Sequence, residues 1–175
     1  MFYWECGILG CERCGRCCIS YGVSVTHLDI MRIARATGRK PSDFVAAIPD
    51  DPKMRAKRVV ALIDGRRSVI CLRWSRDCVC PFYTGSGCAA YDARPMVCRI
   101  YPFTVSWGRL VDSELRACPS RWRSENEAAY IADYKRYDGE LEAYAVIVRE
   151  WNRKGGSLED FVEFALKKVK EETAV

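Results

Sequence analysis

Residues 11–18 read CERCGRCC and place four cysteines within eight consecutive positions. The two-residue spacers between Cys11, Cys14 and Cys17 let a tight loop direct successive thiolates toward one metal ion or one metal cluster. Gly15 supplies the permissive backbone that such a loop needs. Burial of reduced thiols would not require this spacing, so we predict a metal site in this segment.

The whole chain has 11 cysteines among 175 residues and a single histidine. An odd number of cysteines cannot all pair as disulfides, and a chain of this length can fold without many covalent cross-links. Hydrophobic residues make up 49% of the sequence, which excludes a chain that is disordered throughout. The composition therefore predicts one domain over residues 1–175, with a cysteine-rich part at 6–118 and helices at 124–172.

The sequence lacks the marks of a membrane or exported protein. Its uncharged apolar runs, such as residues 59–63, fall far short of the ~18 residues that a membrane helix needs. Residues 1–6 lack the basic and apolar stretches of a signal peptide. We therefore expect a soluble, cytoplasmic protein with no membrane partner. The formal net charge of +5 indicates a mildly basic surface rather than a nucleic-acid partner, and the excess arginine can neutralise an anionic metal site.

The first long helix is expected to begin at Thr26, whose side chain can cap the first turn and pair with Asp29 in a capping box. Gly38 can end this helix, and a shorter helix is expected over residues 42–45. We expect His27, at the start of the first helix, to be exposed or to take part in capping rather than to bind metal.

Two β-hairpins are expected. Residues 59–74 contain two strand-like runs around Asp-Gly at residues 64–65, a strong turn signal. Residues 104–111 form a second candidate around Trp-Gly at residues 107–108. The fold class predicted from these elements is a small α+β domain, in which loops and hairpins carry the metal site and several packed helices surround it.

The last third of the sequence is helical in pattern. Ser124 and Glu127 can form a capping box, Gly139 leaves open whether one helix or two follow, and the glycine pair at residues 155–156 ends the segment. A final amphipathic helix is expected near Ser157. The side chains that recur at helical spacing and are expected in the core are Tyr130, Ile131, Tyr134, Tyr137, Leu141, Tyr144, Ala145 and Val148.

The second cysteine segment, residues 80–102, reads CPFYTGSGCAAYDARPMVCRIYP. Asp92 is expected to cap a short helix over residues 93–99. Pro95 would lie near the first turn of that helix, where its missing N–H does no harm.

Four ordered pieces of the sequence form a recognisable pattern: C-x-x-C-x-x-C-C at residues 11–18, T-x-x-D-x-x-R at 26–32, C-x-F at 80–82, and C-x-x-Y-x-x-R-P-x-x-C-R-x-Y-P at 88–102. Together they resemble the CxxCxxCC, or YkgJ-type, cysteine-cluster family, described as zinc- or iron-chelating. The resemblance extends over residues 11–118. The same domain occurs in flagellin lysine N-methylases, where an iron–sulfur cluster acts with S-adenosylmethionine.

The resemblance implicates as metal ligands the thiols of Cys11, Cys14, Cys17, Cys18, Cys80, Cys88 and Cys98. Cys118 is the natural eighth, because a further cysteine often follows the second segment in similar proteins. Eight thiolates would make two four-sulfur sites, or one cluster and one zinc ion. Cys6, Cys71 and Cys78 lie outside the pattern and are expected to be ordinary buried residues. Cys78 is nevertheless close enough to Cys80 to replace it as a ligand.

Sulfur ligands suit both zinc and iron–sulfur clusters. The first three cysteine spacings match those of bacterial ferredoxins, and aromatic side chains that include Tyr91 and Tyr101 are expected to pack around the site and limit water access. These features favour one or two 4Fe–4S clusters over zinc. In an extended chain the adjacent Cys17 and Cys18 would point to opposite sides, which favours ligation of two different metals.

Arg94 and Arg99 admit two interpretations. Their guanidinium groups could donate hydrogen bonds to thiolates or cluster sulfide, or hold an anionic ligand. Alternatively, they form ion pairs with Asp92 or with Asp29 of the first helix.

Three functions are consistent with these features. The first is an iron–sulfur or zinc protein with a redox or metal-handling role. The second is a protein-lysine N-methyltransferase that uses S-adenosylmethionine, by the family resemblance. The sequence contains neither a Rossmann glycine motif nor the radical-SAM cysteine spacing. The third is a structural zinc module that presents a surface to a partner. A protein partner or protein substrate is compatible with all three, and whether the chain is an enzyme stays open.

Overall fold

The computed structural model describes residues 11, 13–51, 59–75, 77, 79–113, 116–118 and 126–172. Within these residues the chain forms six helices and two small antiparallel sheets, the α+β class that the sequence predicts. In chain order the elements are α1 (Arg16–Ser20), α2 (His27–Thr37), α3 (Pro41–Phe44), β1 (Val45–Pro49), β2 (Ala61–Ile63), β3 (Arg66–Leu72), α4 (Met96–Ile100), β4 (Phe103–Ser106), β5 (Arg109–Asp112), α5 (Glu127–Lys154) and α6 (Leu158–Glu172).

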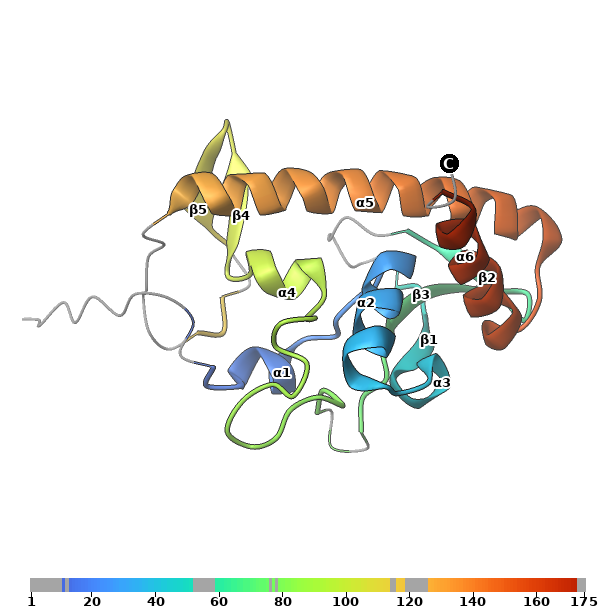
Figure 1. Cartoon of the computed structure of the whole chain (residues 1–175), viewed down its shortest axis with the longest axis horizontal. Helices are drawn as coiled ribbons and strands as arrows, with labels where there is room; N and C mark the ends of the chain where they lie inside the picture. The colour runs from blue at the N-terminus through green and yellow to red at the C-terminus, as the bar shows by residue number, and fades with distance from the viewer. Residues whose placement is uncertain are drawn as a thin grey trace, which may run out of the picture.

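The long helix α5 runs along one side of the molecule (Figure 1). Helix α6 folds back beside its C-terminal end, and α2, α3 and the sheet β1-β3-β2 lie beneath that end. Helix α4 and the β4-β5 hairpin lie toward the N-terminal end of α5, with α1 farther below. No helix in the described part of the chain combines the length and apolar character needed to span a membrane.

Helix α2 begins and ends as its sequence predicts. The Thr26 hydroxyl accepts a hydrogen bond from Asp29 N–H at 3.2 Å, and the Asp29 carboxylate accepts one from Thr26 N–H at 3.0 Å. Gly38 has a φ of 68° and donates its N–H to the Ala34 carbonyl, which ends the helix. The capping box and the left-handed glycine therefore set both ends by local contacts.

The segment after α2 differs from the expectation. The short helix covers Pro41–Phe44, and residues 45–49, for which no strand was predicted, form β1. Strand β1 pairs antiparallel with β3 along its whole length, from Val45 opposite Leu72 to Pro49 opposite Ser68. Because β1 lies at the edge of the sheet, its terminal proline interrupts no ladder on the outer side. The partner strand, rather than local propensity, determines this element.

Both predicted hairpins are present. Asp64 and Gly65 connect β2 to β3 with φ values of 49° and 73°, and Trp107 and Gly108 connect β4 to β5 with φ values of 51° and 74°. Two successive residues with positive φ define the turn that matches the right-handed twist of adjoining strands.

Helix α4 begins later than predicted, and Asp92 does not cap it. Pro95 occupies the N-cap position in an extended conformation, and the helix covers Met96–Ile100. A residue that precedes proline is sterically disfavoured in helical conformation, so Arg94 cannot readily belong to the helix. The first N–H of α4, that of Met96, is accepted instead by Asp29 at 3.0 Å.

The segment around Gly139 forms one helix rather than two. Helix α5 continues through Gly139 without a break and ends at Gly155, which has a φ of 68°. Its N-cap is Asn126, whose side chain accepts a hydrogen bond from Ala129 N–H; the expected cap Ser124 lies outside the described residues. Ser157 precedes α6 and accepts a hydrogen bond from the backbone of its third residue, as a capping residue does.

The apolar core lies between α2, the β1-β3-β2 sheet, the second half of α5, and α6. Trp151 and Phe161 are fully buried, with ring centroids 5.4 Å apart in an edge-to-face arrangement. The Trp151 indole also donates to the Leu62 carbonyl at 2.8 Å. The predicted aromatic stripe of α5 is buried at Tyr144 and only half-buried at Tyr137 and the aromatic residues before it.

Replacing Trp151 with alanine should lower the free energy of unfolding by about 3–5 kcal/mol, because it empties a fully buried site and removes a hydrogen bond. Urea unfolding followed by far-ultraviolet circular dichroism measures this. Trp107→Ala is the matched control, since Trp107 is 99% exposed and should change stability by no more than about 0.5 kcal/mol. Equal unfolding midpoints for the two variants would contradict the location of the core.

Candidate metal centre

Two segments far apart in the sequence meet beside α1. Cys17 and Cys18 lie in α1, and Cys80 and Cys88 lie in the segment that joins β3 to α4. Figure 1 shows this segment passing α1 before it reaches α4, the helix that contains Cys98. A backbone hydrogen bond of 2.8 Å from Cys80 N–H to the Cys18 carbonyl joins the two segments directly.

Cys17 and Cys18 occupy successive positions of a helical turn rather than of an extended chain. Their sulfur atoms are 4.0 Å apart, so the expectation that the two side chains point to opposite sides is wrong. Two thiolates on a tetrahedral zinc ion, each about 2.3 Å from the metal, stand about 3.8 Å apart. The observed separation is therefore close to the one that a shared metal ion requires.

The thiol of Cys18 lies 4.0 Å from that of Cys17, and Cys18 is also joined to Cys80 through the backbone. Interaction with the Cys18 thiol lowers the pKa of Cys17 from 9.0 to about 7, and lowers the pKa of Cys80 from 9.0 to about 7. The same two contacts, together with burial, raise the pKa of Cys18. Without metal, Cys17 and Cys80 therefore carry more thiolate character at neutral pH than Cys18, which stays protonated.

Cys88 and Cys98 belong to the same neighbourhood. Burial raises the pKa of Cys98 well above its usual value, and the negative charges of Cys17 and Cys80 raise it further. Burial also raises the pKa of Cys88, while the positive charge of Arg94 partly opposes this. We call Cys17, Cys18, Cys80, Cys88 and Cys98 the thiol cluster.

Cys11, Cys14 and Cys118 form a second group of thiols near Cys17. The residues Cys11 and Cys14 are exposed, whereas Cys118 is half-buried. Burial raises the pKa of Cys118, and the charges of Cys17, Cys14 and Cys11 raise it further. Cys17 therefore influences both the thiol cluster and this more exposed group of three.

The donor chemistry fits zinc or an iron–sulfur cluster. All nine cysteines in the described part of the chain are free thiols, and soft sulfur ligands select these metals over magnesium or calcium. Among the described residues, no three potential ligand side chains already converge on one point. Metal binding would therefore have to bring the thiols closer together than the contacts of Cys17, Cys18 and Cys80 already do.

Tyr91 connects the first cysteine loop to the second segment. The guanidinium carbon of Arg13 lies 3.8 Å from the centroid of the Tyr91 ring, and that of Arg94 lies 3.9 Å from it. Arg94 also donates a hydrogen bond of 2.8 Å to the Tyr91 carbonyl. The contact with Arg13 joins the first cysteine loop to the second segment, and the contact with Arg94 holds the Tyr91 ring from within the second segment.

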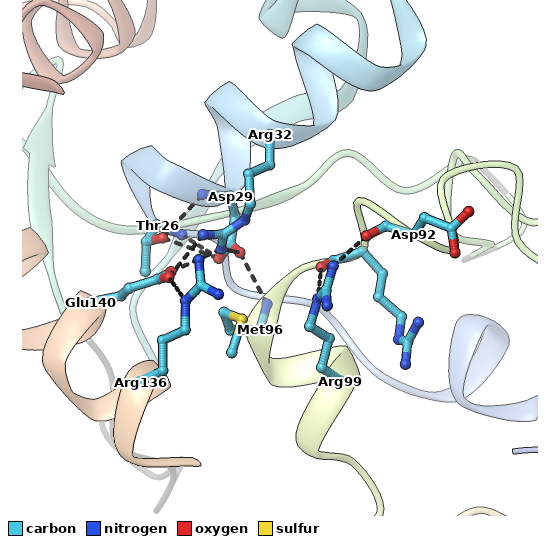
Figure 2. Close-up of polar contacts among 9 residues, drawn as sticks. Thr26, Asp29, Arg32, Asp92, Met96, Arg99, Arg136 and Glu140 are labelled. Atoms are coloured by element: carbon cyan, nitrogen blue, oxygen red, sulfur yellow. Dashed lines mark hydrogen bonds and ion pairs between the residues drawn. The ribbon is translucent and has the colours of Figure 1, made fainter. Parts of the chain in front are cut away.

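The ion pairs considered for Arg94 and Arg99 are not formed. Arg99 donates to the backbone carbonyl of Asp92, not to its carboxylate (Figure 2). The carboxylate of Asp29 is paired with Arg32. The guanidinium of Arg94 instead lies over Tyr91 and donates to its carbonyl, and its charge acts on Cys88; a hydrogen bond from Arg94 to a thiolate or to cluster sulfide stays a prediction.

Tyr101 lies between α4 and the segment that contains Cys118. Its hydroxyl accepts a hydrogen bond from the N–H of Ala117, and its ring contacts Tyr21 with centroids 5.9 Å apart. Burial raises the pKa of Tyr101 to about 12. The phenol therefore stays protonated and fixes the backbone next to Cys118.

A buried charge cluster next to α4 was missed by sequence reasoning. Asp29 and Arg32 belong to the T-x-x-D-x-x-R piece and pair with each other, and Arg32 also binds Glu140 of α5. Glu140 accepts two hydrogen bonds of 2.8 Å from Arg32 and one of 3.0 Å from Arg136 (Figure 2). The available signal was a glutamate directly before the apolar position 141 of an amphipathic helix. A charge on that face predicts a buried partner.

Three other expectations have different outcomes. His27 is fully buried, not exposed, and its ring stacks on Tyr144 with centroids 5.9 Å apart, so the expected surface position is wrong. Cys71 is buried in β3, as expected, and burial raises its pKa to about 11. Cys6 and Cys78 lie outside the described residues.

The model of the CxxCxxCC family, described as a "putative zinc- or iron-chelating domain", matches residues 10–132. The chain belongs to this family. Metal chelation through cysteine is therefore the chemistry that both the family and the free thiols of the site support. No curated protein gave a significant match, and neither did any solved structure.

In the reduced, metal-free protein, alkylation of Cys17 by iodoacetamide should increase with pH around a midpoint near 7, because the thiolate is the nucleophile. Cys71 should stay unmodified in this range, since burial holds its pKa near 11. Tandem mass spectrometry after timed pulses measures both.

Cys18→Ala is the control for the cause of this low pKa. Removal of the hydrogen-bond donor should move the Cys17 midpoint upward, toward 9.0. An unchanged midpoint in this variant, or equal reactivity of Cys71 and Cys17, would contradict the arrangement of the thiols.

Proposed function

We propose that the domain binds an iron–sulfur cluster through cysteine thiolates and serves a redox or metal-handling role. The ligands would come from Cys11, Cys14, Cys17, Cys18, Cys80, Cys88, Cys98 and Cys118. The observation that carries the proposal is the meeting of the two cysteine segments, where the sulfurs of Cys17 and Cys18 are 4.0 Å apart and Cys80 N–H donates to the Cys18 carbonyl at 2.8 Å.

The surroundings of the thiols favour iron–sulfur over structural zinc. Cys80 is 7% exposed, burial dominates the raised pKa of Cys98, and Phe82 beside Cys80 is itself buried. A shielded, polarisable sulfur environment suits a cluster whose reduction potential depends on solvent exposure and on nearby hydrogen bonds. Such a cluster, when bound, would supply reversible one-electron transfer.

The residues around the thiols have separate roles in this proposal. The cysteines bind the metal, and the charge of Arg94 stabilises thiolate at Cys88. Tyr91 holds the two cysteine segments together through its contact with Arg13, while Arg94 packs on the same ring from within the second segment. Tyr101 orients the backbone near Cys118.

Methyl transfer from S-adenosylmethionine to a protein lysine ranks below this role. The sequence contains neither a Rossmann glycine motif nor the radical-SAM cysteine spacing. Calorimetric titration of the metal-loaded protein with S-adenosylmethionine tests this alternative. Saturable binding would raise the methyltransferase above the redox role.

Anaerobic purification should yield a coloured protein that contains iron and acid-labile sulfide. Cys18→Ser and Cys98→Ser should each remove most of the iron, because each variant deletes a ligand. Cys71→Ser should retain it, since Cys71 is buried in β3 outside the cluster. Elemental analysis and electron paramagnetic resonance measure the outcome.

The alternatives give distinct results in the same experiment. A colourless anaerobic protein that holds only zinc would favour the structural zinc module. An ordered protein that binds neither metal would refute metal chelation. Equal loss of iron in Cys71→Ser and Cys98→Ser would refute the ligand assignment.

A further inference from the structure

The carboxylate of Asp29 accepts four hydrogen bonds from three parts of the chain. Its Oδ2 accepts from the Thr26 N–H at 3.0 Å and from the Thr26 hydroxyl at 3.1 Å, within the α2 cap. Its Oδ1 accepts from Met96 N–H at 3.0 Å and from the guanidinium of Arg32. Asp29 is 1% exposed, so these contacts replace all of its hydration.

Met96 is the first residue of α4, and Cys98 follows two residues later. The five-residue helix has no side-chain cap of its own, because the proline at its N-cap offers no suitable side chain. The Asp29 carboxylate therefore takes the place of a cap and comes from a helix 67 positions earlier. The position of the Cys98 backbone depends on it.

Asp29 is in turn held by a chain of charges that reaches α5. Arg32 binds Asp29 and, through two hydrogen bonds of 2.8 Å, both carboxylate oxygens of Glu140. Arg136 also donates to Glu140, so the group contains two acidic and two basic side chains (Figure 2). Glu140 is only 7% exposed, so loss of its charge would leave the Arg32 guanidinium without its main counter-ion.

We infer that Asp29, Arg32 and Glu140 are positioning residues for the metal site. They set metal affinity by holding α4 where Cys98 can join the other thiols. The inference rests on the proposed function, because it takes Cys98 as a ligand. It adds that a helix that contains no cysteine, α5, contributes to metal affinity through Glu140.

The test is the affinity of the full chain for zinc alone, measured by competition with a chromophoric chelator. Glu140→Gln keeps the size of the side chain and removes its charge. It should weaken zinc binding by about tenfold or more, the effect usual for residues that orient metal ligands. Glu150→Gln is the matched control, since Glu150 lies in the same helix and pairs with Lys168 at 2.9 Å on the surface. The zinc affinity of the Glu150→Gln variant should equal that of the wild type.

A double-mutant cycle with Cys98→Ser separates positioning from general destabilisation. If Glu140 acts through Cys98, Glu140→Gln should have little further effect on zinc affinity once Cys98 is serine. An equal loss in both backgrounds would overturn the inference. Wild-type affinity in the folded Glu140→Gln variant would also overturn it, while leaving the proposed function intact. A wild-type chain that binds no zinc and no iron would instead refute the proposed function.

A milder variant covers the case in which Glu140→Gln does not fold. Arg136 is 61% exposed on its side chain, and Arg136→Gln removes only the outer partner of Glu140. We expect this variant to fold and to weaken zinc binding by about twofold, the size of an exposed ion pair. Unchanged affinity in this variant would count against the inference.

Discussion

The position of α4 depends on one buried carboxylate. Asp29 caps its own helix, accepts the first N–H of α4, and holds the guanidinium of Arg32. A carboxylate withdrawn from water must replace every lost hydration contact, and a short helix such as α4 cannot satisfy its own first N–H groups. The Met96 N–H replaces one of the hydration contacts that the carboxylate has lost, and the carboxylate accepts the first N–H of α4. This reciprocal need explains why the second piece of the family pattern, T-x-x-D-x-x-R, contains no metal ligand and yet belongs with the cysteines.

A second constraint is the mutual repulsion of thiolates in a desolvated place. The structure limits it in two ways. Cys18 stays protonated between Cys17 and Cys80, and the positive charge of Arg94 acts on Cys88. These arrangements keep the sulfurs close without a disulfide among the described cysteines. A cation with strong sulfur affinity would neutralise the remaining charge more completely than hydrogen bonds can.

The features that could be predicted from sequence have local causes. The capping box at Thr26 and the turns at residues 64–65 and 107–108 each need only a few adjacent residues with suitable side chains or positive φ. The cysteine spacings likewise indicate metal chemistry without knowledge of the fold. The assignment of individual cysteines as ligands stays a prediction.

The features that could not be predicted depend on partners far along the chain. Strand β1 exists because β3 pairs with it. The first N–H of α4 is accepted by a carboxylate 67 positions away, and Arg32 is paired with Glu140 across 108 positions. The buried position of His27 follows from the ring of Tyr144, which α5 supplies. Periodicity in the sequence shows that such faces are apolar, but it does not reveal which polar groups meet on them.

The hydrogen bond that joins Cys18 to Cys80 also has a consequence for biosynthesis. The first cysteines leave the ribosome well before the later ones, and at ordinary translation speeds the delay up to Cys98 is on the order of ten seconds. During that interval the nascent segment exposes adjacent thiols whose partners do not yet exist. A disulfide formed between these thiols in that interval would consume them before the second cysteine segment has been made.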